Sequence, residues 1–308
     1  MDERNIIWID GFLYENQNAK IHILTHSLHY GTAVFEGIRC YKTQKGLAIF
    51  RLQDHLKRLF DSAKIYFMNI EYSMKELEDA IINTIKKNGL DECYIRPLVY
   101  FGHGKMGVYP LNNKVSVSIA VWKWDEYIKK ENDEQGIRLM VSGWMRIDGR
   151  TMPVHAKATA NYANSALARI EAIKSGFDEA ILLNTAGKVV EASAENIFIV
   201  KNKTLITPPI SSGSLEGITR DTVLALAKED SILTEIRDIS KDELYLADEI
   251  FLTGTAAEIK SVGEIDNRMI GNGKIGTITK RMKNLFEKAI RGNHKYSEKW
   301  LVYISNNN

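Results

Sequence analysis

Lys157 is the residue whose surroundings point most directly to chemistry. It carries the only formal charge between Thr151 and Ala168, whereas 26% charged residues overall would predict about five in such a stretch. Its neighbours are small, and poor solvation lowers the pKa of a lysine. A neutral amine is the nucleophile that Schiff-base chemistry requires. The competing interpretation is a lysine that reaches solvent from a helix of small residues.

Two further polar residues, Glu191 and Tyr162, lie in or beside small-residue segments. Glu191 ends an apolar run and is followed by Ala192, Ser193 and Ala194. A carboxylate at the end of a strand could keep a pyridine nitrogen protonated and so make the ring an electron sink. Each residue also has an ordinary structural interpretation, since Glu191 could cap a turn and Tyr162 could be a core phenol.

Two turns could bind an anion, and one strand could bind a carboxylate. Gly217 precedes an apolar helical run, so the N–H groups of Ile218 and Thr219 would face a phosphate. The segment Thr253–Ala257 has a similar character, although both turn types are common. Tyr94 and Arg96 are two positions apart on a predicted strand and therefore share a face, where they could receive a carboxylate. A solvent-facing strand edge is the alternative, because Pro97 indicates an edge or an irregularity.

Two other patterns are weaker than they look. Residues 271–276 match the GxGxxG dinucleotide fingerprint, but they lie too near the C-terminus for a βαβ unit to follow, so we expect a turn there. His22, His26 and His29 have a spacing that suits metal binding on a helix. However, residues 20–24 alternate like a strand, which would spread the histidines over different faces. No metal site is expected.

Composition limits the classes of function. The 308 residues include 41 basic and 39 acidic ones, scattered along the chain, which gives no nucleic-acid-binding stripe. The two cysteines, Cys40 and Cys93, form no CxxC pattern and favour a reducing compartment. Neither a signal peptide nor a membrane-spanning run is evident, so a cytoplasmic protein is expected.

The periodicity of apolar residues predicts both helices and strands. Apolar residues from Leu52 to Phe67 fall on one helical face, and Ser73 with Glu76 forms a capping box for a helix that ends at Gly89. Further helices are expected after Gly217 and near Thr277. The expected strands are 6–10, 93–101, 115–122 and 137–142, followed by an antiparallel meander at 179–184, 187–191, 196–200 and 203–207.

This order of elements predicts an α+β fold of two mixed domains. The length favours two domains, and the polar segment from Trp124 to Gly136 is the natural connection between them. We expect a smaller N-terminal domain at 1–126, an interdomain loop at 127–133, and a larger cofactor-binding domain at 134–308.

Taken in order, several segments make the chain resemble class IV aminotransferases, and in particular branched-chain amino acid aminotransferases. The resemblance implies a fold type IV pyridoxal-phosphate enzyme, similar to D-amino acid aminotransferase. The matching segments are Thr25–Gly31, Val34–Tyr41, His55–Leu59, Tyr94–Leu98, Ala156–Ala158, Asn161–Tyr162, Glu191–Asn196, Gly217–Arg220 and Thr253–Glu258.

The resemblance also implies roles for individual residues. Lys157 would be the catalytic lysine that forms the Schiff base with pyridoxal 5'-phosphate. Tyr162 would bond the ring hydroxyl and Glu191 would pair with the pyridine nitrogen. The phosphate would be held by Arg58, Ile218, Thr219 and Thr255, with Leu215 packed on the ring.

The substrate would be bound by a second set of residues. Its α-carboxylate would meet Tyr94 and the backbone N–H groups of Thr255 and Ala256, and the distal carboxylate of glutamate would meet Arg96 and Tyr30. The apolar side chain would contact Phe35, Tyr127 and Ala256, with Met106–Val108 supplied by a second subunit.

The implied reaction is reversible amino-group transfer between L-leucine, L-isoleucine or L-valine and 2-oxoglutarate, with the lysine amine as general base and acid. The implied partners are amino acids, 2-oxo acids and another copy of the chain, in a homodimer or a higher assembly based on dimers; no nucleic acid or membrane is involved.

The alternatives are a D-amino acid aminotransferase, an aminodeoxychorismate lyase and a non-catalytic dimeric scaffold. Ala192–Ala194 and Glu216 depart from the commonest family pattern and could alter rate and preference.

Overall fold

The computed structural model describes residues 5–124 and 135–305, and it divides the chain into two compact units. Unit 1 contains Met1–Asp125, Ala156–Ala160 and Ala289–Asn308, and unit 2 contains Glu126–His155 and Asn161–Lys288. The sequence predicts one continuous C-terminal domain at 134–308. In the structure, the segments 156–160 and 289–308 within that range belong to unit 1. Both join unit 1 through strand contacts: Ala158 forms a bridge with Val34, and β17 (Leu301–Tyr303) pairs with β5 (Gly46–Phe50). The predicted loop 127–133 lies outside the described residues.

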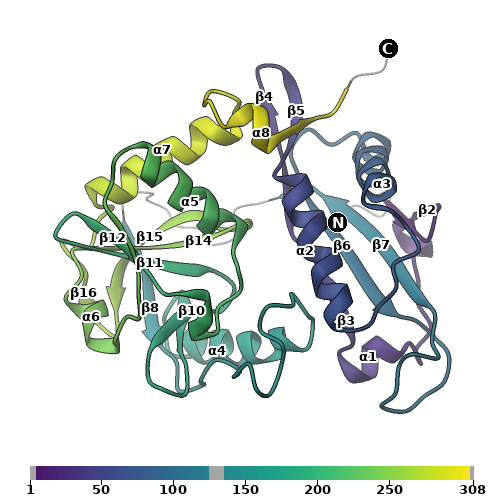
Figure 1. Cartoon of the computed structure of the whole chain (residues 1–308), viewed down its shortest axis with the longest axis horizontal. Helices are drawn as coiled ribbons and strands as arrows, with labels where there is room; N and C mark the ends of the chain where they lie inside the picture. Colours follow the sequence, from purple (N-terminus) through teal and green to yellow (C-terminus); the bar gives the residue numbers. More distant parts are fainter. Residues whose placement is uncertain (1–4, 125–134, 306–308) are drawn as a thin grey trace. The chain divides into compact units, whose positions relative to one another are not determined.

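Unit 1 is built on an antiparallel sheet (Figure 1). Its strands have the order β17-β5-β4-β6-β7-β1-β2, and β3 also pairs with β6. The remaining strands are β1 (Ile6–Ile9), β2 (Phe12–Glu15), β3 (Ala33–Phe35), β4 (Ile38–Thr43), β6 (Cys93–Phe101) and β7 (Val115–Trp122). The helices are η1 (Asn16–Asn18), α1 (His26–Tyr30), α2 (Leu52–Ile65), α3 (Met74–Asn88) and α8 (Ser297–Trp300). Strands β6 and β7 have the predicted bounds, and β1 ends one residue before the predicted strand at 6–10 does.

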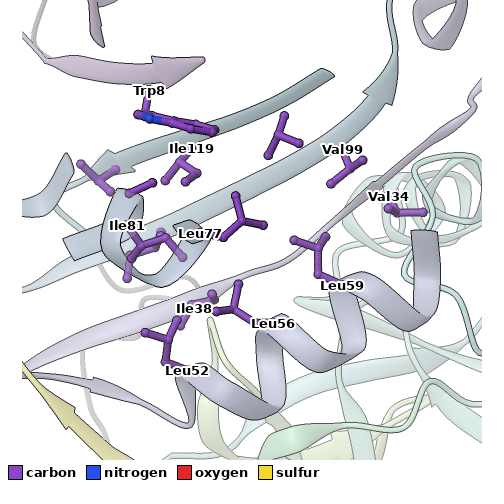
Figure 2. Packing of buried hydrophobic residues seen from close by; sticks show 14 of the residues in the cluster. Trp8, Val34, Ile38, Leu52, Leu56, Leu59, Leu77, Ile81, Val99 and Ile119 are labelled. Carbon is purple, nitrogen blue, oxygen red and sulfur yellow. The ribbon is translucent and has the colours of Figure 1, made fainter. Parts of the chain in front are cut away.

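The two faces of this sheet have different characters because side chains alternate along each strand. One face packs against α2 and α3 in a buried apolar cluster. Figure 2 shows Leu52, Leu56 and Leu59 of α2 within it, together with Val99 and Ile119 of the sheet. The alternate residues of β6, including Tyr94 and Arg96, lie on the opposite face. The apolar core therefore fixes the strands that carry these polar side chains.

The ends of α2 and α3 follow from local chemistry. The capping box between Ser73 and Glu76 is present, and Gly89 ends α3 in a left-handed conformation, so that prediction is confirmed. Helix α2 ends earlier than predicted. The N–H of Met68 donates to the carbonyl of Ala63 and ends the helix, so Phe67 adopts a left-handed conformation with a φ of 56°. Its side chain is 79% exposed. Phe67 is therefore not part of the core stripe.

Unit 2 contains a mixed sheet with the order β10-β9-β8-β15-β14-β11-β12-β13, and β16 pairs with β15. Its strands are β8 (Ile137–Val141), β9 (Glu179–Leu183), β10 (Val189–Ala192), β11 (Asn196–Lys201), β12 (Thr204–Thr207), β13 (Thr234–Ile236), β14 (Glu249–Gly254), β15 (Glu258–Ile265) and β16 (Arg268–Met269). The helices are α4 (Asn161–Lys174), η2 (Ile210–Ser212), α5 (Ile218–Glu229), α6 (Lys241–Tyr245) and α7 (Thr277–Ile290).

The predicted meander is wrong at one connection. Strands β9 and β10 form a hairpin, as do β11 and β12, but β11 pairs with β14 and not with β10. The segment 193–195 forms a turn, which is closed by a hydrogen bond from the N–H of Ala192 to the carbonyl of Glu195. After this turn the chain continues as β11 beside β14. Alternation predicts strands, but it does not state which strands are neighbours.

The two weak motifs have structural roles. Gly271 and Gly273 have positive φ angles in the turn before α7, as expected. His26 is buried, and its ring bonds Thr32 and the carbonyl of Gly107. Residues 20–24 do not form the predicted strand. Across 5–124 and 135–305 there is no cluster of three or more potential metal-binding side chains, and no helix is long and apolar enough to cross a membrane.

Candidate active site

Lys157 lies in an irregular segment of unit 1, and its backbone is fixed on both sides. Its N–H donates to Ser62 Oγ at 3.1 Å, and its carbonyl accepts the N–H of Phe35 at 3.0 Å. The side-chain Nζ lies 5.0 Å from the centroid of the Phe35 ring. The residue does not belong to a helix, so the interpretation as a lysine reaching solvent from a helix is wrong.

The amine of Lys157 is poised for nucleophilic chemistry. Burial and the nearby Arg58 guanidinium lower the pKa of Lys157 to about 8, although Glu36 opposes this effect. At pH 7 such a pKa leaves roughly one amine in ten neutral, compared with about one in three thousand at the ordinary value. The lack of nearby charges in the sequence predicts a shift in this direction. The structure adds that a specific cation contributes.

Beside Lys157, unit 1 contains a buried group of charged and polar side chains. Glu36 is fully buried and accepts from Arg58 Nε at 2.6 Å and from Arg58 Nη2 at 2.9 Å. His55 Nδ1 lies 2.7 Å from Glu36 Oε2. Burial alone would raise the pKa of Glu36, but Arg58 and His55 outweigh it and hold that pKa well below its usual range. Burial also lowers the pKa of His55, so the ring is neutral near pH 7 and donates through Nδ1.

Tyr94 is held against the backbone and against an aromatic ring. It stacks on Trp124 with ring centroids 4.3 Å apart. Its hydroxyl lies so close to Gly37 that a Cβ built there would be 1.9 Å from the oxygen. Glycine at position 37 is therefore required by this close approach, and it helps to fix the hydroxyl that could meet a carboxylate.

Arg96 lies on the same face of β6 as Tyr94, as predicted. Its guanidinium carbon is 4.8 Å from the Phe35 ring centroid, 5.5 Å from that of Tyr94 and 5.7 Å from that of Trp122. Its Nε is buried, and no hydrogen-bond acceptor meets it within the described residues. Strand β6 is internal, so the edge interpretation is wrong. Pro97 has no N–H to donate, and it is tolerated because it lies where the neighbour of β6 changes from β4 to β3. Its carbonyl accepts the N–H of Glu36.

The remaining predicted residues of unit 1 are more exposed. Tyr30 ends α1 and is 40% exposed, and its ring lies 4.5 Å from that of His26. Met106 and Val108 are exposed in the loop between β6 and β7. Tyr127 lies outside the described residues.

In unit 2, Glu191 is buried and accepts several hydrogen bonds. Arg146 Nη2 lies 2.9 Å from its Oε1, while Asn196 Nδ2 and the N–H of Leu215 each donate to Oε2 at 3.2 Å. Leu215 is half-buried. These contacts fix the carboxylate, and the explanation of Glu191 as a simple turn cap is insufficient. Arg146 and Asn196 were not singled out from the sequence.

The loop before α5 has the geometry of an anion site. Gly217 is the N-cap of this helix of 12 residues, and Ile218 and Thr219 form its first turn. A Cβ at Gly217 would lie 1.8 Å from Asn196 Oδ1, so glycine allows Asn196 to connect Glu191 with this loop. Glu216, which departs from the family pattern, is exposed.

The other predicted residues of unit 2 occupy turns and helix ends. Thr255 and Ala256 lie in the tight turn between β14 and β15 and are half-buried. Tyr162 is the second residue of α4 and is also half-buried. Among the atypical residues Ala192–Ala194, the first two are buried and Ala194 is exposed.

A second buried carboxylate lies on the segment that follows Glu191. Burial and the neighbouring Glu179 raise the pKa of Glu195 well above its usual range, although Arg169 opposes this effect. Arg169 pairs with Glu179. Glu195 therefore ionises less readily than an ordinary glutamate, whereas Glu191 pairs directly with Arg146.

Each unit carries groups of a kind that binds part of a phosphorylated pyridine aldehyde. Unit 1 offers an amine of lowered pKa and a fixed guanidinium, and unit 2 offers a buried carboxylate and a helix N-terminus. An amine condenses with an aldehyde, a carboxylate pairs with a protonated ring nitrogen, and N–H groups and guanidinium bind phosphate.

Comparison with known proteins agrees with this chemistry. Residues 33–265 match the family model of class IV amino-transferases. The branched-chain-amino-acid aminotransferase of Escherichia coli K12 is 44% identical over 300 residues, which cover 97% of each chain.

Solved structures give the same result. A branched-chain amino acid aminotransferase of T.th., solved with pyridoxamine 5'-phosphate, is 44% identical, has a TM-score of 0.95, and is matched over 98% of this chain and 99% of its own. The same protein is known with N-(5'-phosphopyridoxyl)-L-glutamate, at 43% identity and a TM-score of 0.94 over the same shares. The predicted fold class is confirmed, and the chain belongs to the class IV aminotransferases, within the branched-chain amino acid aminotransferase family.

Proposed function

We propose that this protein reversibly transfers the amino group of L-leucine, L-isoleucine or L-valine to 2-oxoglutarate with pyridoxal 5'-phosphate. The observation that carries the proposal is the fixed position of Lys157, whose amine lies 5.0 Å from the centroid of the apolar Phe35 ring and whose backbone N–H is held by Ser62, in a chain that is 44% identical to a branched-chain-amino-acid aminotransferase. Such an amine can bind an aldehyde and then exchange protons near neutral pH.

Lys157 has two tasks in this reaction. When bound, the cofactor supplies an electrophilic carbon and a ring that accepts electrons. Lys157 would hold the cofactor through its amine, and the same amine would serve as the base and acid that moves the proton at the substrate Cα. A pKa of about 8 allows this group to act both as a base and as an acid near neutral pH.

Glu191 keeps the pyridine nitrogen protonated, and Tyr162 donates to the ring hydroxyl. Arg146 and Asn196 hold Glu191 in one orientation, because each bonds its carboxylate. Arg58, Ile218, Thr219 and Thr255 bind the phosphate, and Leu215 packs on the ring. These assignments follow the family resemblance and are supported by the buried, fixed positions of Glu191 and Arg58.

Substrate selection depends on the polar face of β6. Tyr94 and the N–H groups of Thr255 and Ala256 bind the α-carboxylate. Phe35 and Ala256, with Tyr127, contact an apolar side chain, whereas Arg96 and Tyr30 bind the distal carboxylate of glutamate. The aromatic rings around Arg96 support this dual use, because they contact its guanidinium and also offer apolar surface to a hydrocarbon side chain.

The proposed assembly is a homodimer or a larger assembly of dimers. Unit 1 exposes several apolar side chains on α1, the segment before it, and the β6–β7 loop: Ile21, Ile23, Leu28, Met106 and Val108. Apolar exposure of this kind is typical of protein interfaces. Met106–Val108 would enter the substrate site of the neighbouring subunit. A cytoplasmic location is also proposed, supported by the free, buried Cys40 and Cys93.

A donor panel tests the proposal. The purified protein, loaded with pyridoxal 5'-phosphate, should lose its cofactor absorbance at visible wavelengths on addition of L-leucine, L-isoleucine, L-valine or L-glutamate, and 2-oxoglutarate should restore it. D-alanine and aminodeoxychorismate serve as controls for the two related activities. A response to either control with none to L-leucine would overturn the proposal.

A further inference from the structure

The carboxylate of Glu36 is surrounded by donors in a region where burial should make it unfavourable. In addition to two nitrogens of Arg58 and one of His55, it accepts the N–H of Gly37 at 3.2 Å. Both of its oxygens are satisfied, and the Arg58 guanidinium is engaged along one edge. An arginine held in this bidentate way loses its freedom of rotation.

Helix α2 brings the participants to one stripe. His55, Arg58 and Ser62 are spaced by three and four positions, beside the core stripe of Leu52, Leu56 and Leu59 shown in Figure 2. Ser62 accepts the backbone N–H of Lys157. The same helical face therefore holds the backbone of Lys157 and the cation beside its amine.

The charges around Lys157 oppose one another. Arg58 on α2 and Arg96 on β6 disfavour a charged amine, whereas Glu36, between β3 and β4, and Tyr94 on β6 favour it. Glu36 thus balances the cation that it also orients. A phosphate group is repelled by Glu36, so the carboxylate is not there to strengthen anion binding by its charge.

We propose that Glu36 and His55 are positioning residues, which hold Arg58 toward the phosphate group of the cofactor and limit the effect of Arg58 on the amine of Lys157. This inference rests on the proposed function, because it takes the cofactor to be pyridoxal 5'-phosphate. His55 keeps Glu36 in place by donating its Nδ1 proton, and Glu36 in turn fixes two nitrogens of Arg58.

The test compares the binding of pyridoxal 5'-phosphate and of pyridoxal to the apoprotein. The ratio of their dissociation constants measures the contribution of the phosphate group. In Glu36→Gln, we expect this preference to fall at least about tenfold, as for the loss of one charge-assisted hydrogen bond. The pH midpoint for capture of pyridoxal by Lys157 should also fall below that of the unaltered protein. The negative charge of Glu36, which opposes the effect of Arg58 on the Lys157 amine, is then absent.

A double-mutant cycle separates positioning from general stability. If Glu36 acts through Arg58, Glu36→Gln should have no further effect on the phosphate preference in an Arg58→Met background. Equal effects in both backgrounds would overturn the proposal. So would an unchanged preference and midpoint in a folded Glu36→Gln protein that still binds pyridoxal 5'-phosphate. Failure of the unaltered protein to bind the cofactor would instead contradict the proposed function.

His55 provides a matched pair of variants, which also carries the test if Glu36→Gln does not fold. His55→Asn keeps an N–H donor near the place of Nδ1, whereas His55→Leu removes it. We expect His55→Asn to retain most of the phosphate preference and His55→Leu to lose it. The same preference in both variants would exclude His55 from the positioning role.

Discussion

Replacement of Arg96 by methionine tests how one site accepts both an apolar and an acidic side chain. The stem of methionine occupies similar space, but the charge and the donors are lost. A charge-assisted hydrogen bond contributes roughly 1.5–3 kcal/mol, which corresponds to about 10- to 150-fold in rate or affinity. We therefore expect Arg96→Met to slow the half-reaction with L-glutamate at least about tenfold and that with L-leucine much less.

The structure also predicts that this variant remains folded. Each of the three ring contacts contributes about 0.5–1 kcal/mol at a partly exposed site, so their loss together costs about 1.5–3 kcal/mol. Removal of the buried Nε, which has no acceptor within the described residues, restores about 1–3 kcal/mol. The two effects oppose each other, so the free energy of unfolding should change by no more than about 2 kcal/mol in either direction.

Single-turnover kinetics would measure each half-reaction through the cofactor absorbance. Arg150→Met provides a control, because Arg150 is an 83% exposed arginine that pairs with Asp148 and belongs to neither set of site residues. Equal losses with L-glutamate and L-leucine would show that Arg96 serves the α-carboxylate or only the fold. The dual-substrate assignment of β6 would then have to be abandoned.

Four other outcomes are expected. Lys157→Ala should lose turnover and the visible cofactor absorbance, and substantial turnover without an added amine would contradict its role. Acylation of Lys157 in the apoprotein should rise with pH around a midpoint near 8 rather than 10.5, as measured by peptide mass spectrometry. Glu191→Gln should reduce the rate strongly and the cofactor affinity modestly; an unchanged rate would refute its pairing. Val108→Glu should weaken the assembly, as measured by light scattering, and should reduce activity to the same extent. A monomer with full activity would contradict this prediction.

The elements were largely predictable because they depend on short-range periodicity. Strand β6 has the predicted bounds, since its aromatic and β-branched residues favour a strand and Gly102 follows its last residue. The N-terminus of α3 was predictable from Ser73 and Glu76 alone. The end of α2 was not, because Phe67 continues the apolar spacing while its backbone has already left the helix.

The partners of the charged residues could not be predicted from one sequence. Glu36 meets Arg58 and His55, and Glu191 meets Arg146, across separations of many positions that no local pattern records. Such contacts depend on the pairing of strands and on the packing of a helix over them. The family resemblance supplied Arg58 and Glu191 as candidates, but it gave no reason to single out Arg146 or Asn196.

The small residues around Lys157 have a second physical cause besides desolvation. Ala156 and Ala158 are almost completely buried and belong to the same apolar cluster as α2 and β3. Ala158 forms a bridge with Val34, and Lys157 is bonded on one side to Phe35 and on the other to Ser62. Larger side chains at the alanines would have to displace well-packed core residues. The low charge of the segment predicts a lowered pKa for its lysine. It equally reflects a backbone inserted between a strand and a helix, and that insertion fixes the amine next to Arg58 and Glu36.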